Sequence, residues 1–445
     1  MAVLYTPRRM LDRIAFHSRF LRNAALNVLA LVPLGGCALL SSNPPAAPPA
    51  PAPAVVVAPD PHAPRLTPLD TRKFELADGQ EVIGETQVLF SHYEDTFAAI
   101  ARVYDLGYEE LRVANPTVDK WLPGVDTPVY LPTQTILPEA PRKGIVINVP
   151  AMRLFYFETP KGSTEKAPAK KVVAGAAPAQ KAVPTAEPAA KAEGVAAAVT
   201  PAVAQKPVEP AAGVMTVTSY PIGIGAEGWA TPFGEAKVTG KARDPVWYPP
   251  ASVRKEHADR GDPLPSVVKA GPDNPLGRYA LTLSLPSYLI HGTNTPAGVG
   301  MRSSHGCIRL YPEDIEALFG RVAKGTPVRL VNQPVLAAWQ GNNLYLEVHP
   351  PLSESDSDLV ADAERVLAAA LERAGSPAGA AVDHELVARV VTEKRGIPFP
   401  VLRSGPAPDR YLASVRHVEN TVPVEPADKT ARTEDPAAPA APSPR

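Results

Sequence analysis

Short runs of aliphatic, β-branched and aromatic residues recur through the middle of the chain, and turn residues separate them. This pattern is typical of β-strands in a sandwich or a barrel. We therefore predict a mainly β domain, sandwich-like or barrel-like, over residues 144–335. Its expected strands are Ile145–Asn148, Leu154–Phe157, Met215–Tyr220, Tyr279–Leu283 and Tyr288–His291.

A helical spacing of apolar residues precedes this region. Phe97, Ile100, Ala101 and Tyr104 fall on one helix face, and Asp95 is the expected N-cap. A second short helix is expected to end before an Asn-Pro pair. With a candidate strand on each side, the order strand, helix, helix, strand predicts a small βααβ domain within residues 73–137. The other three elements are expected at Gln87–Phe90, Tyr108–Val113 and Pro128–Pro132.

Further helical patterns lie in and after the β-rich region. A helix over residues 312–319 is indicated by Pro312 at its start and by acidic residues in its first turn. An apolar stripe then runs from Leu359 to Leu371, and a shorter helix is expected over residues 384–392. Together the last two patterns predict a short helical C-terminal appendage over residues 352–420.

Proline and alanine limit how much of the 445-residue chain can form a packed core. With 54 prolines, we expect small folded units joined by linkers. The Pro/Ala-rich stretch over residues 37–72 predicts an extended tether. A tract over residues 161–212, inserted into the β-rich domain, and the tail over residues 421–445 are predicted to be disordered.

Charge excludes one class of partner. The 45 basic and 46 acidic residues nearly cancel, so the chain has no broad positive field that would attract nucleic acid. We expect no nucleic-acid partner, and we expect recognition to depend on local groups.

The first 36 residues read as an export signal. Several arginines precede an apolar run, Ala24 to Leu34, which is too short to span a bilayer. The run ends in Leu34-Gly35-Gly36-Cys37, which resembles a bacterial lipobox. The resemblance implies lipidation of Cys37 and a periplasmic protein tethered to a membrane, and Ala38 behind the cysteine favours the outer membrane. The alternative is a cysteine placed there by chance.

Cysteine number then singles out one residue. The chain has two cysteines, and if Cys37 carries lipid, no internal disulfide can form. Cys307 is left as a lone thiol, which is a liability in an oxidising compartment unless its reactivity is used. A thiol attacks an amide when a base removes its proton, and His291 is the candidate base. The backbone carbonyl of Gly292 could hold the imidazole in the productive tautomer.

The motif around these residues is specific. His291-Gly292-Thr293-Asn294 is followed by Ser303-Ser304-His305-Gly306-Cys307-Ile308-Arg309. This arrangement resembles the catalytic signature of the L,D-transpeptidase (YkuD-type) family, and the resemblance extends over most of residues 144–331. It implies a YkuD-type β fold and a cysteine acyltransferase that needs no cofactor.

The remaining motif residues are assigned to the oxyanion and the substrate. Gly306 permits a tight turn, so that successive N–H groups, including that of Cys307, could converge on the developing oxyanion. Ser304 belongs to the same group, and His305 either orients substrate or holds the loop. Arg302 and Arg309 could bind peptide carboxylates through forked hydrogen bonds, although a structural ion pair is an alternative for Arg309. A metal site built from two histidines and Cys307 has too few ligands, so no metal is expected.

The βααβ segment resembles a LysM domain. The matching landmarks are Glu94–Phe97, Ile100-Ala101, Tyr104, Ala114–Pro116 and Val129–Pro132. Glu94 stands where glycine is common, and the stretch Thr117–Thr127 is longer than usual. The resemblance implies binding of N-acetylglucosamine-containing glycan, and the alternative is a spacer that binds nothing.

By resemblance, the substrate is peptidoglycan. Cys307 would attack the bond between meso-diaminopimelate and the terminal D-alanine of a tetrapeptide stem and form a thioester. The acceptor stays open: a diaminopimelate amine giving a 3-3 cross-link, a lysine of an envelope lipoprotein, or water, which would make the enzyme an L,D-carboxypeptidase. A non-catalytic wall-binding lipoprotein is the alternative from another class.

Overall fold

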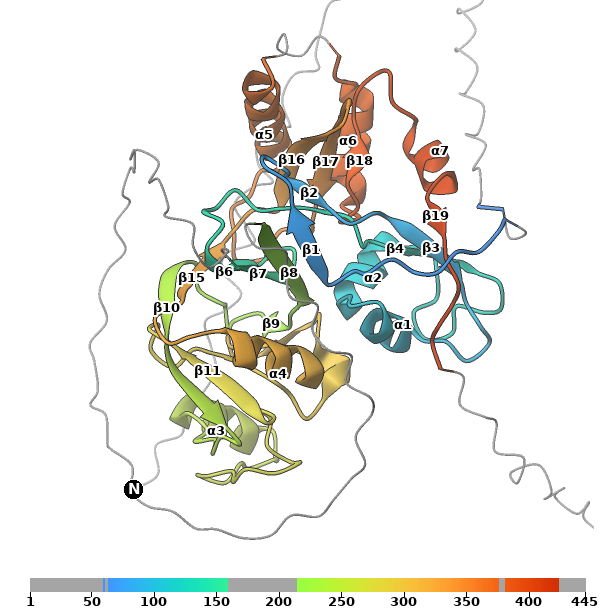
Figure 1. Ribbon diagram of the computed structural model, residues 1–445. Coiled ribbons are helices and arrows are strands. Elements are labelled where there is room, and N and C mark those ends of the chain that lie inside the picture. Colours follow the sequence, from blue (N-terminus) through green and yellow to red (C-terminus); the bar gives the residue numbers. More distant parts are fainter. Residues whose placement is uncertain (1–58, 61–62, 159–213, 376–380, 424–445) are drawn as a thin grey trace, which may run out of the picture. The chain divides into compact units, whose positions relative to one another are not determined.

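The computed structural model describes residues 59–60, 63–158, 214–375 and 381–423 (Figure 1). The predicted signal peptide, Cys37, most of the tether, the tract over residues 161–212 and nearly all of the tail lie outside the described residues. Among the helices that are described, none is long and apolar enough to cross a membrane.

A nine-stranded sheet forms the β-rich domain, with the strand order β1-β8-β7-β6-β15-β10-β11-β12-β14. The predicted strands are present, whereas the ten-residue strand β10 was not predicted from the hydrophobic pattern. The strands are β1 Lys73–Leu76, β6 Gly144–Asn148, β7 Arg153–Glu158, β8 Met215–Pro221, β10 Gly234–Arg243, β11 Tyr279–Leu283, β12 Leu289–His291, β14 Ile308–Arg309 and β15 Pro327–Val331. Because β7 and β8 pair as antiparallel neighbours, the tract between them joins adjacent strands and does not interrupt the sheet.

Two features bring the motif residues to one end of this sheet. Strands β12 and β14 pair in parallel, with His291 opposite Arg309. Helix α4 (Pro312–Arg321) follows β14 and buries Ile315 and Leu318 in the same core as Ile290 and Ile308. Pro312 and the acidic first turn are where the sequence predicted them. A two-stranded sheet of β9 (Ile224–Gly225) and β13 (Arg302–Ser304) lies at the start of the nucleophile loop.

The small N-terminal unit has its elements in the predicted order: β3 (Gln87–Phe90), α1 (Phe97–Val103), α2 (Tyr108–Ala114) and β4 (Pro128–Leu131). The expected N-cap is wrong by one residue. Thr96, in place of Asp95, caps α1, and its hydroxyl accepts a hydrogen bond from the N–H of Ala99 at 3.2 Å. Asp95 instead accepts from the side-chain amide of Asn420 at 2.6 Å.

The limits predicted for this unit are also wrong. Residues 73–76 form β1 and pair with β8 of the large sheet. In their place, β19 (Arg416–His417) pairs in parallel with β3, so the unit takes a strand from the far end of the chain. Val422, predicted to lie in a disordered tail, packs in the core of the same unit. Pairings over 300 residues leave no local pattern in the sequence.

The C-terminal region is not a purely helical appendage. Helices α5 (Leu359–Arg373) and α6 (His384–Glu393) are present as predicted. Their apolar faces pack on a three-stranded sheet of β16 (Val335–Gln340), β17 (Asn343–Val348) and β18 (Phe399–Pro400). The remaining elements are β2 Val82–Ile83, which pairs with β5 Thr135–Ile136, the short helix α7 Pro408–Ala413 and α3 Ala251–Asp259.

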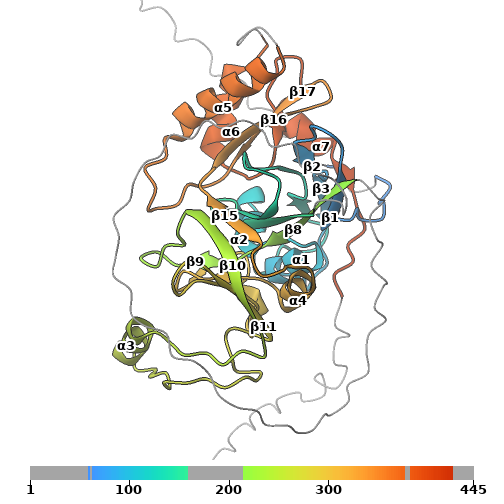
Figure 2. The ribbon, with the colours of Figure 1, turned by 60° about the vertical axis from the view of Figure 1, so that its left-hand side comes forward.

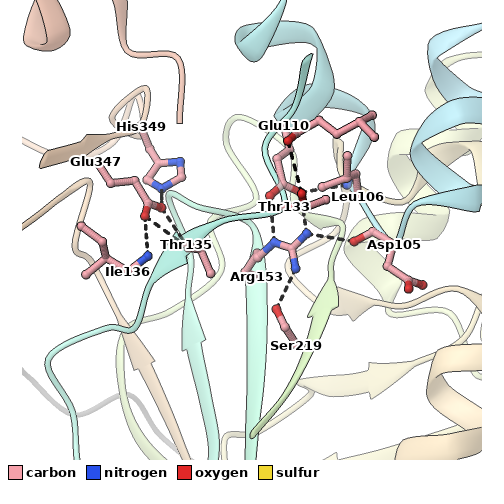
Figure 3. Close-up of polar contacts among 12 residues, drawn as sticks. Asp105, Leu106, Glu110, Thr133, Thr135, Ile136, Arg153, Ser219, Glu347 and His349 are labelled. Carbon is pink, nitrogen blue, oxygen red and sulfur yellow. Dashed lines mark hydrogen bonds and ion pairs between the residues drawn. The ribbon is translucent and has the colours of Figure 1, made fainter. Parts of the chain in front are cut away.

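A buried arginine connects the small unit to the large sheet (Figure 3). Arg153 of β7 donates to the Glu110 carboxylate of α2 at 2.8 Å and to the Asp105 carbonyl at 2.8 Å. It also donates to the Ser219 hydroxyl of β8 at 2.7 Å. Both charges are almost fully buried, so the loss of either partner would leave an uncompensated charge at a cost of roughly 3–5 kcal/mol.

A second buried network connects the C-terminal sheet to the linker that follows β4 (Figure 3). The Glu347 carboxylate of β17 accepts from the Ile136 N–H at 2.6 Å and from the Thr135 hydroxyl at 3.0 Å. Its other neighbour is Nε2 of His349, at 2.6 Å. These contacts satisfy an acid that is 1% exposed and join β17 to β5.

Candidate active site

The backbone of the next residue orients the imidazole ring of His291. It ends β12, between Ala280 of β11 and Arg309 of β14. Its Nδ1 lies 2.7 Å from the carbonyl oxygen of Gly292. Because a carbonyl can only accept, Nδ1 carries the proton and Nε2 keeps its lone pair. The tautomer that we predicted from Gly292 is therefore the one this geometry requires.

The surroundings keep this imidazole neutral. His291 is 3% exposed, and burial, followed by the charge of Arg309, lowers its pKa from 6.5 to about 3. Contacts with the backbone of Gly292 and Leu276 oppose the shift without cancelling it. At neutral pH the imidazole is thus neutral, with its proton on Nδ1 and its acceptor lone pair on Nε2.

Cys307 lies directly before β14. It directly follows Gly306, whose backbone conformation favours glycine. Gly306 has φ +99°, and a Cβ there would come within 2.8 Å of the Tyr288 ring. The thiol is unpaired and points its Sγ at the Ser287 carbonyl, 3.6 Å away. Burial raises the pKa of Cys307, so the resting pair is a neutral thiol and a neutral imidazole.

Internal hydrogen bonds fix the nucleophile loop. The Ser304 hydroxyl donates to the Cys307 carbonyl at 2.6 Å and accepts from the Gly306 N–H at 3.2 Å. The Gly306 N–H is therefore already engaged within the loop and is not one of the N–H groups free to converge on an oxyanion. The N–H of Cys307 remains the candidate donor. Ser304, 2% exposed, holds the turn.

Thr231 is a positioning residue that the sequence did not reveal. Its hydroxyl donates to the Gly306 carbonyl and accepts from the Gly225 N–H, both at 3.0 Å. It thereby ties the turn before the nucleophile to β9. Nothing in the sequence indicates this bridge.

His305 holds the loop to a neighbouring helix. Its Nε2 lies 3.1 Å from the Glu256 carboxylate of α3, and its ring meets the Trp229 ring edge-on at 4.8 Å. Burial lowers the pKa of His305, while Glu256 opposes the shift. Of the two roles left open for His305, these contacts support loop attachment.

Arg309 and Arg302 differ in their surroundings. Arg309 lines the cavity that contains Cys307, and its Nη1 donates to the Ser303 hydroxyl at 3.3 Å. Its buried Nε has no hydrogen-bond partner, and no acid in the described ranges forms an ion pair with it, so the described residues do not support the ion-pair alternative. Burial lowers the pKa of its guanidinium.

Arg302 does not reach this cavity, which corrects its predicted role in binding substrate. It pairs with Glu354 and donates to the Ser353 hydroxyl at 3.1 Å. The sequence could not show this, because its partners lie some fifty residues further along the chain.

The loop between base and nucleophile is attached to the small N-terminal unit. The N–H groups of Tyr108 and Glu109, in the first turn of α2, donate to the carbonyls of Val299 and Gly300 at 3.4 and 3.0 Å. The contact is backbone to backbone: a Cβ on Gly300 would come within 2.2 Å of Gly107. Helix α2 thus satisfies its free N-terminal donors on the catalytic loop.

His291 and Cys307 open into one cavity of about 810 Å³. Residues of the segment 244–278 line one side of this cavity. The segment contains α3 and joins β10 to β11 (Figure 2). Across the described parts of the chain, no cluster of three or more His, Cys, Asp or Glu side chains could hold a metal ion. A lone thiol and a neutral imidazole of fixed tautomer therefore line one cavity, and these are the groups that a thiol nucleophile and its general base require.

Comparison with known proteins gives the family. The YkuD family of L,D-transpeptidase catalytic domains matches residues 211–330. The "Probable L,D-transpeptidase YcfS" of Escherichia coli K12 is 33% identical over 338 residues, which cover 74% of this chain and 88% of that protein. The "Probable L,D-transpeptidase YbiS" of the same strain is 36% identical over 284 residues, 63% of this chain and 75% of that protein. The "Probable L,D-transpeptidase ErfK/SrfK" of Salmonella typhimurium LT2 is 31% identical over 333 residues, 74% and 90%. The chain belongs to the L,D-transpeptidase family and is an enzyme of that activity.

Proposed function

We propose that Cys307 forms a thioester with peptidoglycan stems and passes the acyl group to an amine. The thiol proton moves to Nε2 of His291 as Sγ attacks the carbonyl between meso-diaminopimelate and the terminal D-alanine. The C–N bond then breaks, the proton goes to the leaving amine, and D-alanine departs. The observation that carries the proposal is the Nδ1 contact of His291 with Gly292, which leaves Nε2 free to accept this proton.

The second half-reaction restores the enzyme. A neutral amine attacks the thioester carbonyl, the C–S bond breaks, and the amine proton returns to sulfur through His291. A diaminopimelate amine gives a 3-3 cross-link, and a lysine of an envelope lipoprotein gives wall attachment. Water in the same position gives hydrolysis.

Arg309 is proposed as the anchor for a stem carboxylate. It lies two residues from the nucleophile, lines the same cavity and carries an unpartnered Nε. A buried guanidinium without an acid is costly, and a substrate carboxylate would supply the missing partner.

The unit over residues 87–131 is proposed to bind the glycan strand. The loops on either side of its two helices expose Tyr93 (74%), Trp121 (62%) and Leu122 (63%). Aromatic faces of this kind stack on sugar rings. Lipidation at Cys37 would hold the enzyme on the periplasmic side of the outer membrane, and residues 37–72 would extend it toward the wall.

The deciding experiment uses purified disaccharide tetrapeptide and mass spectrometry. Wild type should acquire the mass of the acyl group on Cys307 and release D-alanine. Cys307→Ala should do neither and keep its melting temperature. Cys307→Ser should be nearly inactive, because the hydroxyl is far less acidic than the thiol. D-alanine release by Cys307→Ala at the wild-type rate would overturn the mechanism, and a wild type that binds wall without releasing D-alanine would support the non-catalytic alternative.

Glycan binding is tested separately on the inactive Cys307→Ala protein by sedimentation with insoluble peptidoglycan. Adding Trp121→Ala should reduce the bound fraction. Adding Val360→Ala, which removes an exposed apolar side chain from α5, should not. Equal binding by all three proteins would favour the spacer alternative.

A further inference from the structure

Two side chains of opposite formal charge line the cavity around Cys307. Among its described lining residues Arg309 and Asp273 are the only Arg, Lys, Asp or Glu, and three others are histidines. Two of these histidines face acids of their own: His305 pairs with Glu256 and His257 with Asp262. Asp273 is exposed, and no hydrogen bond or ion pair from the described residues engages its carboxylate.

The turn that carries Asp273 is firmly built. The next residue, Asn274, is fully buried, and its side chain donates to the carbonyls of Pro245 and Lys269 at 2.8 and 3.1 Å. Its side-chain oxygen accepts from the Leu276 N–H at 2.9 Å. The Asp273 carboxylate therefore lies on a fixed part of the cavity wall.

This turn is seated beside the catalytic base. A Cβ on Gly277 would come within 2.8 Å of the Thr293 nitrogen and 3.1 Å of the Gly292 carbon. The Leu276 backbone contacts the His291 imidazole. Asp273, three residues before Leu276, thus belongs to the His291 side of the cavity, whereas Arg309 belongs to the strand that follows Cys307.

Aromatic side chains line the same wall. Trp247 exchanges backbone hydrogen bonds with Val268 at 2.9 and 2.8 Å, which fixes its place in the segment. Tyr248 beside it is 68% exposed, and both line the cavity. A cavity lined by a carboxylate and by aromatic side chains is an environment that favours an ammonium group.

We propose that Asp273, with Trp247 and Tyr248, forms the subsite that binds the ammonium of the acyl acceptor. The inference rests on the proposed thioester mechanism and names the acceptor class: a primary amine on a flexible chain. The ammonium binds at Asp273, loses one proton to solvent, and attacks the thioester as the neutral amine. His291 lies on this side to take the second proton. Water gains nothing from the carboxylate, so the subsite favours transfer over hydrolysis.

The test measures how the acyl-enzyme divides between acceptors. Full-length protein is acylated with disaccharide tetrapeptide in the presence of Nα-acetyl-lysine amide, which carries one ammonium, or hydroxylamine, which is uncharged near neutral pH. Mass spectrometry gives the ratio of amide to hydrolysed tripeptide, and D-alanine release gives the rate of acylation. Asp273→Asn should raise the concentration of Nα-acetyl-lysine amide needed for half-maximal transfer roughly threefold to tenfold, as expected for one partly screened ion pair.

Two controls make the result specific. Transfer to hydroxylamine and release of D-alanine should be unchanged in Asp273→Asn. Asp259→Asn removes the same charge from α3 outside the cavity and should behave as wild type. Raising the salt concentration from 0.05 to 0.5 M should weaken lysine transfer in wild type and leave it unchanged in Asp273→Asn.

The failures are separable. If Asp273→Asn transfers to lysine as well as wild type does, or loses lysine and hydroxylamine transfer equally, the ammonium subsite is wrong. If wild type releases no D-alanine from the donor, the proposed function itself fails.

Discussion

The neutral state of His291 leads to a prediction about stability in acid. Its pKa is about 3 in the folded protein and about 6.5 in an unfolded chain. The unfolded state therefore binds the extra proton first, and stability is lost as the pH falls below the unfolded value. Between pH 7.5 and 5.0 this one group should lower the free energy of unfolding by about 2 kcal/mol.

The perturbation is His291→Gln, which removes the titration and keeps a side chain of similar size. Chemical denaturation at pH 7.5 and 5.0 gives the loss of stability for each protein. The loss should be about 2 kcal/mol larger in wild type than in His291→Gln. Other titrating groups contribute equally to both proteins and cancel in this difference.

A matched control is His384→Gln at an exposed position on α6, which should show the wild-type loss. Equal losses in wild type and His291→Gln would refute the buried neutral imidazole. The assignment of Nε2 as the resting proton acceptor would then fail as well.

Three further outcomes follow from the site and its support. Gly306→Ala should lower kcat/KM by about tenfold or more, because its Cβ meets the Tyr288 ring. Gly228→Ala, also at positive φ but with open space, should strain the backbone and lower stability while leaving kcat/KM nearly unchanged. Thr231→Val should reduce kcat and also lower the melting temperature, because the buried Gly225 N–H and Gly306 carbonyl lose the hydroxyl that bridges them. Burial raises the pKa of Asp314 from 3.8 to about 7. Wild type should therefore lose stability relative to Asp314→Asn as the pH rises from 4 to 7, measured by denaturation at both values; parallel curves would contradict this.

The proposed catalytic pair could be singled out from the sequence because its information is local. Cys307 stands out as a lone thiol, and the glycine before it and the carbonyl after His291 act within one or two residues. The helices could be predicted for the same reason, since capping and apolar spacing are short-range properties. Thus α2, α4, α5 and α6 lie within two residues of their expected limits.

Features that depend on distant partners could not be predicted. Strands β18 and β19 are two residues each and exist only because they pair with β17 and β3. The sequence predicted Arg302 as a substrate ligand, because its ion-pair partner Glu354 lies some fifty residues further along the chain. Asp273 lies in a stretch without periodicity. Its place in the cavity depends on the hydrogen bonds by which Asn274 fixes the turn.

The pairing of β19 with β3 has a consequence for how the protein matures. Synthesis delivers residues 87–131 early, yet their sheet is completed by Arg416–His417 and their core by Val422. The folding of that unit can be completed only after almost the whole polypeptide has been synthesised. Contacts so distant in sequence also form slowly. A chain that stops before residue 416 lacks β19 and Val422, so its N-terminal unit should be more sensitive to proteases even though residues 87–131 are intact. The stability of the N-terminal unit thus depends on Arg416, His417 and Val422, which are synthesised more than 280 residues after its own last strand.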